Sequence, residues 1–378
     1  MKEGWEYKKL GEVCRIERGG SPRPIKDFIT NSPDGLNWIK IGDTDPQGKY
    51  IYSTKEKIKP EGLRKSRWVE VDEFLLSNSM SFGRPYILKT NGCIHDGWLV
   101  LRDYQNSLII DYFYYLLISP HVQNQFRTKA QGSTVSNLNT DRVADVNIAF
   151  PPLSEQQSIV DYLDSAFAKI DAMKANAEKN LNEAKALFQA SLKEMLEPKE
   201  GWEEKTLPEI SENLDSIRKP VTKGKRTAGI YPYYGASGIV DYVDDYLFDE
   251  DLLCISEDGA NLLMRTYPIA FPISGKVWVN NHAHVLRFKS IVTQKYVEYC
   301  FSGMKLDEYI TGAAQPKLTQ KALNSIIINL PSTLDEQQSI VATLDSLKSK
   351  VDKLQENYDK ISQECDALKQ SILRQVFE

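Results

Sequence analysis

The chain has 378 residues, of which 41% are hydrophobic and 26% are charged, and its formal net charge is −5. This length allows two or three domains, each with its own core, and the negative charge argues against a simple basic nucleic-acid binder. No apolar run approaches the roughly 18–20 residues of a membrane helix. The N-terminal segment has no apolar signal core, and the five scattered cysteines fit a reducing compartment. A cytoplasmic protein is therefore expected.

The acidic residues are concentrated in two short segments. Residues 151–198 carry 5 Lys and Arg against 8 Asp and Glu, and residues 331–378 carry 6 against 9. Residues 1–150 have the opposite balance, with 21 basic against 18 acidic residues. Local basic clusters therefore exist despite the overall charge.

Residues 1–150 are expected to form a first mixed α/β domain. Strands are predicted at 38–41 and 74–76, and a short helix at 111–117, from β-branched, aromatic and apolar runs. A basic cluster within thirteen residues gives candidate DNA contacts, because such side chains can neutralise phosphates. Its members are Lys55, Lys57, Lys59, Arg64, Lys65 and Arg67. A solvated charged loop is the other reading of this cluster.

Residues 151–198 are predicted to form a central spacer helix. Ser154 and Gln157 form a capping box directly after Pro151 and Pro152, and Pro198 ends the helix. Apolar residues at alternating steps of three and four give a heptad seam, which is typical of helix pairing. The seam residues expected to pair are Ile159, Leu163, Ile170, Met173 and Leu187.

Residues 199–330 are expected to form a second mixed domain, with a strand at 276–279 and a helix at 294–301. Its basic cluster, together with the adjoining Tyr234, gives further candidate DNA contacts: Arg218, Lys219, Lys223, Lys225 and Arg226. His282 and His284 could in principle chelate a metal from one face of a strand, but no third ligand is visible. We therefore expect no metal site, and a structural or DNA-contacting role for the segment Asn281–His284.

Residues 331–378 are predicted to form a second, C-terminal spacer helix, which Asp335 and Gln338 would cap. Its pairing seam is longer and bulkier than the first, and consists of Leu344, Leu347, Val351, Leu354, Ile361 and Leu368. A helix of about 43 residues spans about 65 Å, which is too long for one domain of this size to cover. We therefore expect the two helices to pack together rather than each to cap its own domain.

An internal repeat organises the whole chain. The hexapeptide at 155–160 recurs identically at 336–341, and the Gly-Trp-Glu at 4–6 recurs at 201–203. The chain is therefore a duplication with copies at about 1–198 and 199–378. The predicted fold is α+β: two mixed α/β domains in tandem, separated by two long helices packed as an antiparallel coiled coil with pseudo-two-fold symmetry.

Motifs for catalysis are missing from the sequence. There is no glycine-rich phosphate-binding loop and no Asn/Asp-Pro-Pro-aromatic motif, and the acidic residues between 241 and 251 have no partnered His or Lys nearby. His95 and Asp96 form half of a triad without an identifiable serine elbow. We therefore expect no enzymatic activity and no catalytic residue.

The whole chain resembles the specificity subunits of Type I restriction–modification enzymes. The resemblance rests on segments such as 4–13, 38–43, 231–236, 256–260, 276–286, 314–318 and the Pro-Pro-Leu-x-Glu-Gln-Gln start of the central helix. Gln315 and Lys317, in the 314–318 segment, are further candidate DNA contacts. It implies two target-recognition domains, each reading one half of an asymmetric bipartite DNA target. The blocks diverge where Ser77–Met80 and Ile94–Gly97 of the first stand opposite Ser256–Gly259 and Asn280–Ala283 of the second.

The same resemblance implies the partners: double-stranded DNA, two methyltransferase subunits and two restriction/translocase subunits. S-adenosylmethionine, ATP and Mg²⁺ would then be bound by those subunits and no cofactor by this chain. The alternatives are a freestanding sequence-specific DNA-binding regulator and a coiled-coil scaffold that binds proteins. If the helices set the spacer between half-sites, four residues inserted near Leu196 should lengthen it by one or two base pairs.

Overall fold

The computed structural model describes residues 4–46, 48–78, 83–104, 106–130, 138–312 and 314–378. It divides into two compact units that do not coincide with the two repeats. Unit 1 consists of residues 1–176 together with 359–378, and unit 2 consists of residues 177–358. The boundaries therefore fall inside the two long helices, α5 (Leu153–Met195) and α10 (Leu334–Phe377), rather than at their ends.

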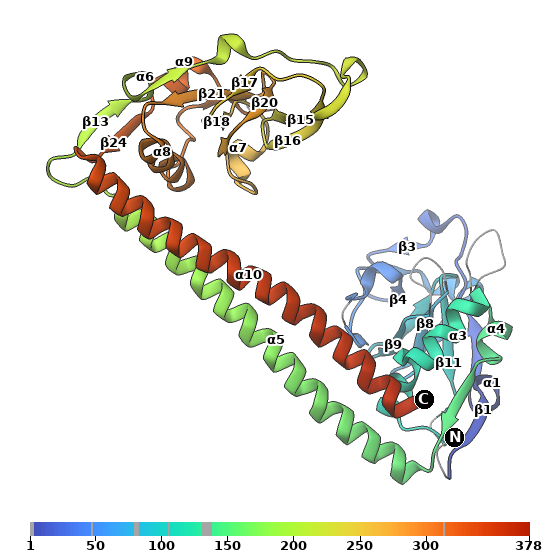
Figure 1. Ribbon diagram of the computed structural model, residues 1–378. Helices are drawn as coiled ribbons and strands as arrows, with labels where there is room; N and C mark the ends of the chain where they lie inside the picture. The colour runs from blue at the N-terminus through green and yellow to red at the C-terminus, as the bar shows by residue number, and fades with distance from the viewer. Residues whose placement is uncertain (1–3, 47, 79–82, 105, 131–137, 313) are drawn as a thin grey trace. The chain divides into compact units, whose positions relative to one another are not determined.

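In the described part of unit 1, two five-stranded sheets and one strand pair form the globular region (Figure 1). The first sheet has the order β2 (Arg15–Arg18), β11 (Trp98–Arg102), β8 (Phe74–Ser77), β9 (Pro85–Leu88), β5 (Tyr50–Ile51). The second has the order β3 (Ile29–Thr30), β6 (Glu56–Ile58), β4 (Leu36–Ile39), β10 (Gly92–Ile94), β7 (Arg67–Val69). β1 (Glu6–Lys9) pairs antiparallel with β12 (Asn147–Phe150).

The helices of unit 1 cover the first sheet and supply much of its core. They are α1 (Leu10–Val13), α2 (Ile110–Ile118), α3 (Pro120–Ala130) and α4 (Thr140–Ala144), with 3-10 turns η1 (Ile25–Asp27), η2 (Ile41–Asp43) and η3 (Pro60–Lys65). The predicted strand at 38–41 ends at Ile39, because the chain enters the η2 turn. The helix predicted at 111–117 is confirmed as α2.

Unit 2 repeats this plan with shorter sheets in its described residues. One four-stranded sheet has the order β14 (Ser211–Asn213), β21 (Ala283–Phe288), β18 (Leu252–Ser256), β19 (Ala270–Ile273). The other has the order β16 (Gly238–Val243), β15 (Ala228–Gly235), β20 (Lys276–Val279), β17 (Phe248–Asp249). The strand pairs are β13 (Glu203–Thr206) with β24 (Ile327–Leu330), and β22 (Ile310–Thr311) with β23 (Lys317–Leu318).

Unit 2 also contains helices at places equivalent to those of unit 1. They are α6 (Leu207–Ile210), α7 (Asn261–Met264), α8 (Ile291–Gly303) and α9 (Gln320–Asn324), with 3-10 turns η4 (Asp215–Ile217) and η5 (Lys223–Lys225). The strand predicted at 276–279 is confirmed as β20, and the helix predicted at 294–301 lies within α8.

The duplication extends to the side chains that tie each long helix to its domain. Trp5 donates to Glu155 at 2.6 Å, and Trp202 donates to Glu336 at 3.0 Å. The equivalent amides near the two helix starts act alike, because each donates to the carbonyl oxygen of the proline that precedes its helix (Gln156 to Pro151 and Gln337 to Pro331). The repeat seen in the sequence is therefore a repeat of tertiary contacts.

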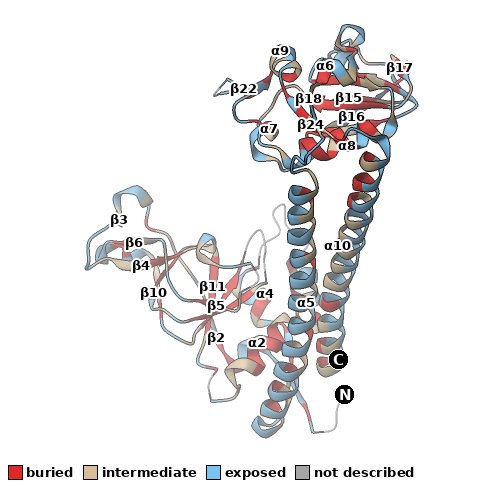
Figure 2. Ribbon diagram, turned by 90° about the vertical axis from the view of Figure 1, so that its left-hand side faces the viewer, coloured by how far each residue is buried: buried red, intermediate tan, exposed pale blue. Residues whose placement is uncertain are grey.

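The helices pack antiparallel within each unit and are exposed over most of their remaining surface (Figure 2). In unit 1, Cys365 lies against the backbone of Ile170, and Lys369 pairs with Asp171 at 2.5 Å. In unit 2, Lys185 donates to Gln355 at 2.7 Å. The expected antiparallel pairing of the two helices is confirmed.

The predicted seam is wrong at three positions. Met173, Leu187 and Leu368 are 59%, 60% and 47% exposed. In α5 the step after Ile170 is four residues rather than three, and the partly buried positions are Lys174 and Phe188. In α10 the step after Cys365 is likewise four residues, so Lys369 takes the place of Leu368. The remaining predicted seam residues are buried or half-buried: Ile159, Leu163, Ile170, Leu344, Leu347, Val351, Leu354 and Ile361.

Each domain core is completed by the far end of the other repeat's helix. Leu373 and Phe377 of α10 are buried in the core of unit 1, and Leu192 of α5 is buried in the core of unit 2 with Leu196 packed against it. The proposed insertion near Leu196 is therefore wrongly placed, because it would disrupt a packed core instead of lengthening a free helix end.

Candidate nucleic-acid interface

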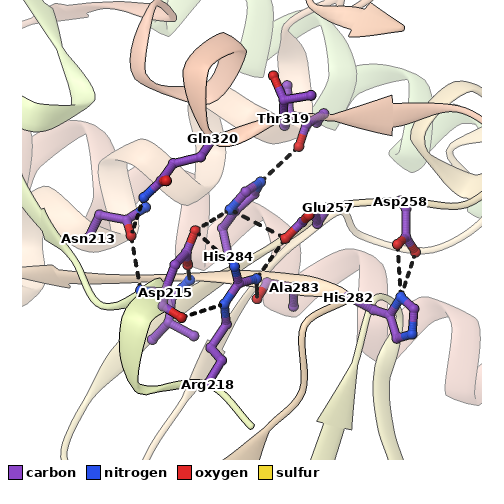
Figure 3. A network of polar contacts seen from close by, with 12 residues as sticks. Asn213, Asp215, Arg218, Glu257, Asp258, His282, Ala283, His284, Thr319 and Gln320 are labelled. Carbon is purple, nitrogen blue, oxygen red and sulfur yellow. Dashed lines mark hydrogen bonds and ion pairs between the residues drawn. The ribbon is translucent and has the colours of Figure 1, made fainter. Parts of the chain in front are cut away.

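A network of buried charged side chains lies at one end of the β14–β21–β18 sheet of unit 2 (Figure 3). The side chain of His284 is only 1% exposed, and its Nδ1 lies 2.6 Å from Asp215. Arg218 contacts Asp215 at 3.2 Å and Glu257 at 2.7 Å, while Lys317 contacts Glu257 at 3.0 Å. The network joins the η4 turn to β18, β21 and β23.

Both ring nitrogens of His284 face hydrogen-bond acceptors. Its Nε2 lies 2.8 Å from the carbonyl oxygen of Leu318, and its Nδ1 faces the Asp215 carboxylate. A carbonyl and an ionised carboxylate can only accept, so both ring nitrogens are placed to donate. His284 thus ties Asp215 in the η4 turn to the backbone at Leu318.

The two carboxylates stay ionised despite their burial. Burial raises the pKa of Asp215, but the hydrogen bond from His284 and the nearby Arg218 charge outweigh it, so the pKa lies below its ordinary 3.8. Burial likewise raises the pKa of Glu257, and hydrogen bonds from Arg218 and Lys317 bring it below 4.5. The network is thus a set of mutually satisfied charges that fixes the sheet end.

The solvent-facing side of this network carries exposed polar side chains. His282, half-exposed, holds its Nδ1 2.8 Å from Asp258 (Figure 3). Asn281 and Gln315 are exposed beside it in the turn before β21 and in the loop before β23. The two histidines of the Asn281–His284 segment therefore contact different carboxylates and play different roles.

The strand registers show which residues of units 1 and 2 are equivalent at this end of the sheet. Trp98 pairs with Ser77 as Ala283 pairs with Ser256, so Asp96 and Gly97 correspond to Asn281 and His282. The alignment read from the sequence, which placed Ile94 opposite Asn280, is therefore wrong by one residue. The predicted contrast at Ser79 and Met80 lies outside the described residues.

In unit 1 the equivalent turn is held by different polar contacts. Asp96 accepts a hydrogen bond from Ser21 at 2.6 Å and pairs with Arg23 at 3.3 Å. The hydrogen bond from Ser21 and the charge of Arg23 lower the pKa of Asp96 against a smaller effect of burial. A buried leucine, Leu99, occupies the place of His284.

The side chains of the first basic cluster are exposed or half-exposed, and several of them contact groups within the protein. The ammonium groups of Lys55, Lys57 and Lys59 each reach a backbone carbonyl oxygen, of Gly42, Pro33 and Asp27 respectively. Arg67 pairs with Glu17 at 3.1 Å, which holds its charge within the protein. Arg64 and Lys65, at the end of the η3 turn, are exposed.

The second cluster is split by the fold. Lys219, Lys223 and Lys225 are exposed, as phosphate contacts require. Arg218 belongs to the buried network, and Arg226 pairs with Asp241 at 2.9 Å over the ring of Tyr233. The structure thus places these two arginines in internal contacts rather than on the free surface. Tyr234 is stacked on Phe271 and packs against the core of its sheet.

Several residues of these sites were not singled out from the sequence. Asp215 had no marker, because the segments that bring it to His284 are far apart in the chain. Glu257 and Asp258 stood in a segment that differs between the two copies, and His282 and His284 stood beside an asparagine, but neither signal paired the carboxylates with the histidines. Ser21 and Arg23 were missed for the same reason.

No helix in the described ranges is long and apolar enough to cross a membrane. Among the same residues, no group of three or more His, Cys, Asp and Glu side chains is arranged to hold a metal ion.

Comparison with known proteins gives concordant matches. Residues 2–183 and 199–363 each match the model of the type I restriction modification DNA specificity domain. A putative type I restriction enzyme specificity subunit of Haemophilus influenzae is 36% identical over 157 residues, covering 41% of this chain and 40% of that protein. The EcoprrI specificity subunit of Escherichia coli is 22% identical over 90% of this chain and 86% of that protein.

The solved structures agree in fold. A structure described as the basis of complex assembly and conformational transition of the type I R-M system has a TM-score of 0.77 at 18% identity, covering 99% of this chain and 97% of that one. The HsdS subunit from Thermoanaerobacter tengcongensis has a TM-score of 0.60 at 19% identity, covering 100% and 97%. With two matched copies of the domain over most of its length, the chain belongs to the type I restriction–modification DNA specificity family.

Proposed function

We propose that this chain is the non-catalytic DNA-recognition subunit of a type I restriction–modification complex. Unit 1 carries one reader of a bipartite target, and unit 2 carries the other. The proposal rests on the contrast between the tertiary contacts that the two copies share and the turns in which their side chains differ. The Trp–Glu and Gln–Pro contacts are the same in both copies, whereas the turns before β11 and β21 present different polar groups.

The exposed apolar residues of the long helices support two copies of one partner. Leu187 of α5 and Leu368 of α10 occupy equivalent positions of the repeat and are both exposed, as are Leu153 and Leu334. Equivalent apolar side chains on two copies of a helix suit the same partner surface twice. We assign these positions to two methyltransferase subunits, with two restriction/translocase subunits completing the complex.

The cofactors follow from this division of labour. S-adenosylmethionine is assigned to the methyltransferase subunits, and ATP and Mg²⁺ to the translocase subunits. The chain itself supplies sequence reading and acts in the cytoplasm, where the DNA is. The compact charge network of unit 2 suits a rigid support for such reading, because its charged groups are satisfied by one another.

The decisive experiment is methylome sequencing of a host that expresses the chain with its methyltransferase. We expect a bipartite methylated motif that disappears when this chain is deleted. Replacing residues 199–330 with the equivalent block of a relative should change one half of the motif. A change in both halves, or methylation that persists without the chain, would contradict the proposal.

A separate experiment, at the boundary between the units, tests whether the two long helices set the spacer between the half-sites. Because the junction crosses both helices, one heptad is inserted after Asn176 and another after Tyr358, which keeps the seam in register. Seven residues add about 10 Å, or about three base pairs. The expected motif keeps both half-sites and has a longer spacer; an active variant with the original spacer would show that the helices do not set the distance.

A further inference from the structure

The turns before β11 and β21 have the same backbone but carry different side chains. In unit 1, His95 Nδ1 accepts a hydrogen bond from the backbone N–H of Gly97 at 2.7 Å. In unit 2, Asn280 Oδ1 accepts from the backbone N–H of His282 at 2.8 Å. A shared support that presents unlike polar groups is the arrangement expected where two readers distinguish different bases.

In unit 1 the turn fixes an exposed arginine. The side chain of Arg23 is 80% exposed, and one of its terminal nitrogens lies 3.3 Å from Asp96. Asp96 is itself fixed, because Ser21 donates to its carboxylate and Asn78 donates to its carbonyl oxygen at 2.9 Å. The carboxylate orients the guanidinium and leaves its other N–H groups toward solvent. A guanidinium oriented in this way can donate two hydrogen bonds to guanine O6 and N7.

In unit 2 the turn fixes an exposed imidazole. His282 is 48% exposed, and its Nδ1 lies 2.8 and 3.0 Å from the two carboxylate oxygens of Asp258. Its carbonyl oxygen accepts from the backbone N–H of Glu257, which belongs to the buried network. Because Asp258 can only accept, the hydrogen of a neutral ring lies on Nδ1, and Nε2 is an acceptor. Such an acceptor suits the exocyclic amino group of adenine or cytosine.

We propose that Arg23 held by Asp96 and His282 held by Asp258 are specificity-determining base readers, one for each half-site. Arg23 reads a guanine, and His282 reads a base with an exocyclic amino group. Asp96 and Asp258 are positioning residues that set the direction of each reader. This inference rests on the proposed function, and it adds which side chains read and which chemical class of base each one takes.

The test uses the chain expressed with its methyltransferase, and methylome sequencing as the readout. Arg23→Ala should relax one guanine of the first half-site, with a loss of discrimination of roughly 5- to 150-fold at that position. Arg23→Lys should restore part of this preference, because an ammonium still donates but cannot form the two-pronged contact. The second half-site should stay unchanged in both variants.

For unit 2, His282→Ala should relax one position of the second half-site by a similar factor. Asp258→Ala is the sharper variant, because it removes the carboxylate that holds the ring hydrogen on Nδ1. Nε2 can then be a donor or an acceptor, and the preference for adenine or cytosine at the same position should broaden. His282→Gln should keep an adenine preference, since an amide can both donate to and accept from adenine.

Arg64→Ala and Lys225→Ala are the matched controls, since both side chains are exposed cations of the same units. They should weaken binding to all sequences and leave the motif intact. An unchanged motif in Arg23→Ala or in His282→Ala, with a normal unfolding midpoint, would overturn the assignment for that reader. An unchanged preference in Asp258→Ala would overturn the role of Asp258. Absence of any methylated motif with the wild-type chain would instead refute the proposed function.

Discussion

Units 1 and 2 share an arrangement of strands, but different side chains stabilise the end of the sheet that contains β11 in unit 1 and β21 in unit 2. Unit 1 buries Leu99 and Trp98 there, whereas unit 2 buries His284, Asp215, Arg218 and Glu257 as one charged network. An apolar end tolerates isosteric exchange, but a buried network requires every partner. The two copies thus share the backbone arrangement, whereas the side chains at this end of the sheet differ.

The largest expected effect comes from breaking the network. Arg218→Met removes a charged partner of both Asp215 and Glu257, and it should lower the free energy of unfolding of unit 2 by about 3–5 kcal/mol. Hydrogen exchange of β21 compared with β11 measures the two units separately. The control is Arg15→Ala, which removes the exposed pair with Asp103 at 3.0 Å and should cost under about 1 kcal/mol. Equal losses in both variants would show that the network is not a special support.

The next largest expected difference between the units is in their stability at low pH. The pKa values of Asp215 and Glu257 are lowered in the folded state, so their stabilisation is complete above about pH 4.5 and is lost as the pH falls through the lowered values. Each carboxylate can contribute up to roughly 1.4 kcal/mol per pH unit in that window. Hydrogen exchange between pH 6 and pH 3 should show β21 losing protection before β11. Asp215→Asn should reduce this difference, and an unaltered difference would contradict its assignment to the network.

The helix ends give a smaller contrast between the units. In unit 1 the ring of Phe377 is buried 5.6 Å from the ring of Tyr112. At the equivalent place in unit 2, Leu196 borders a cavity of about 300 Å³ that is also lined by Leu192, Cys300 and Met304. Phe377→Leu should therefore destabilise unit 1 by about 1–2 kcal/mol, whereas Leu196→Phe should stabilise unit 2 by about 0.5–2 kcal/mol. Urea denaturation measures both, and a destabilising Leu196→Phe would show that the cavity cannot admit a ring.

The smallest expected effect concerns the two basic clusters. Replacing Lys55, Lys57 and Lys59 by Ala should reduce the slope of binding against salt concentration by roughly 0.9 for each phosphate that is no longer neutralised. The matching unit 2 variant replaces Lys219, Lys223 and Lys225. DNA binding of the assembled complex at several salt concentrations gives both slopes. An unchanged slope in either variant would assign that cluster to ordinary protein surface.

The sequence was sufficient for the duplication, the two long helices and their antiparallel pairing, because these depend on repeats and on local periodicity. It failed at Met173, Leu187 and Leu368, where four-residue steps in α5 and in α10 move the seam. It also placed Arg218 on the surface, since a basic run looks the same whether a distant carboxylate meets it or not. The contacts of Asp215, Glu257 and Asp258 depend on strand pairing, which no local pattern encodes.

The division of the chain has a consequence for its biosynthesis. Unit 2 is continuous, whereas the core of unit 1 needs Leu373 and Phe377 from α10, which follows unit 2 in the sequence. On the ribosome, unit 2 can therefore complete its core before unit 1 does, although unit 1 is synthesised first. Nascent chains that end before residue 359 should hold a protease-resistant second unit and an incomplete first one. The recognition domain that is synthesised first is thus the last to mature, and only a chain translated beyond Phe377 has both domain cores complete.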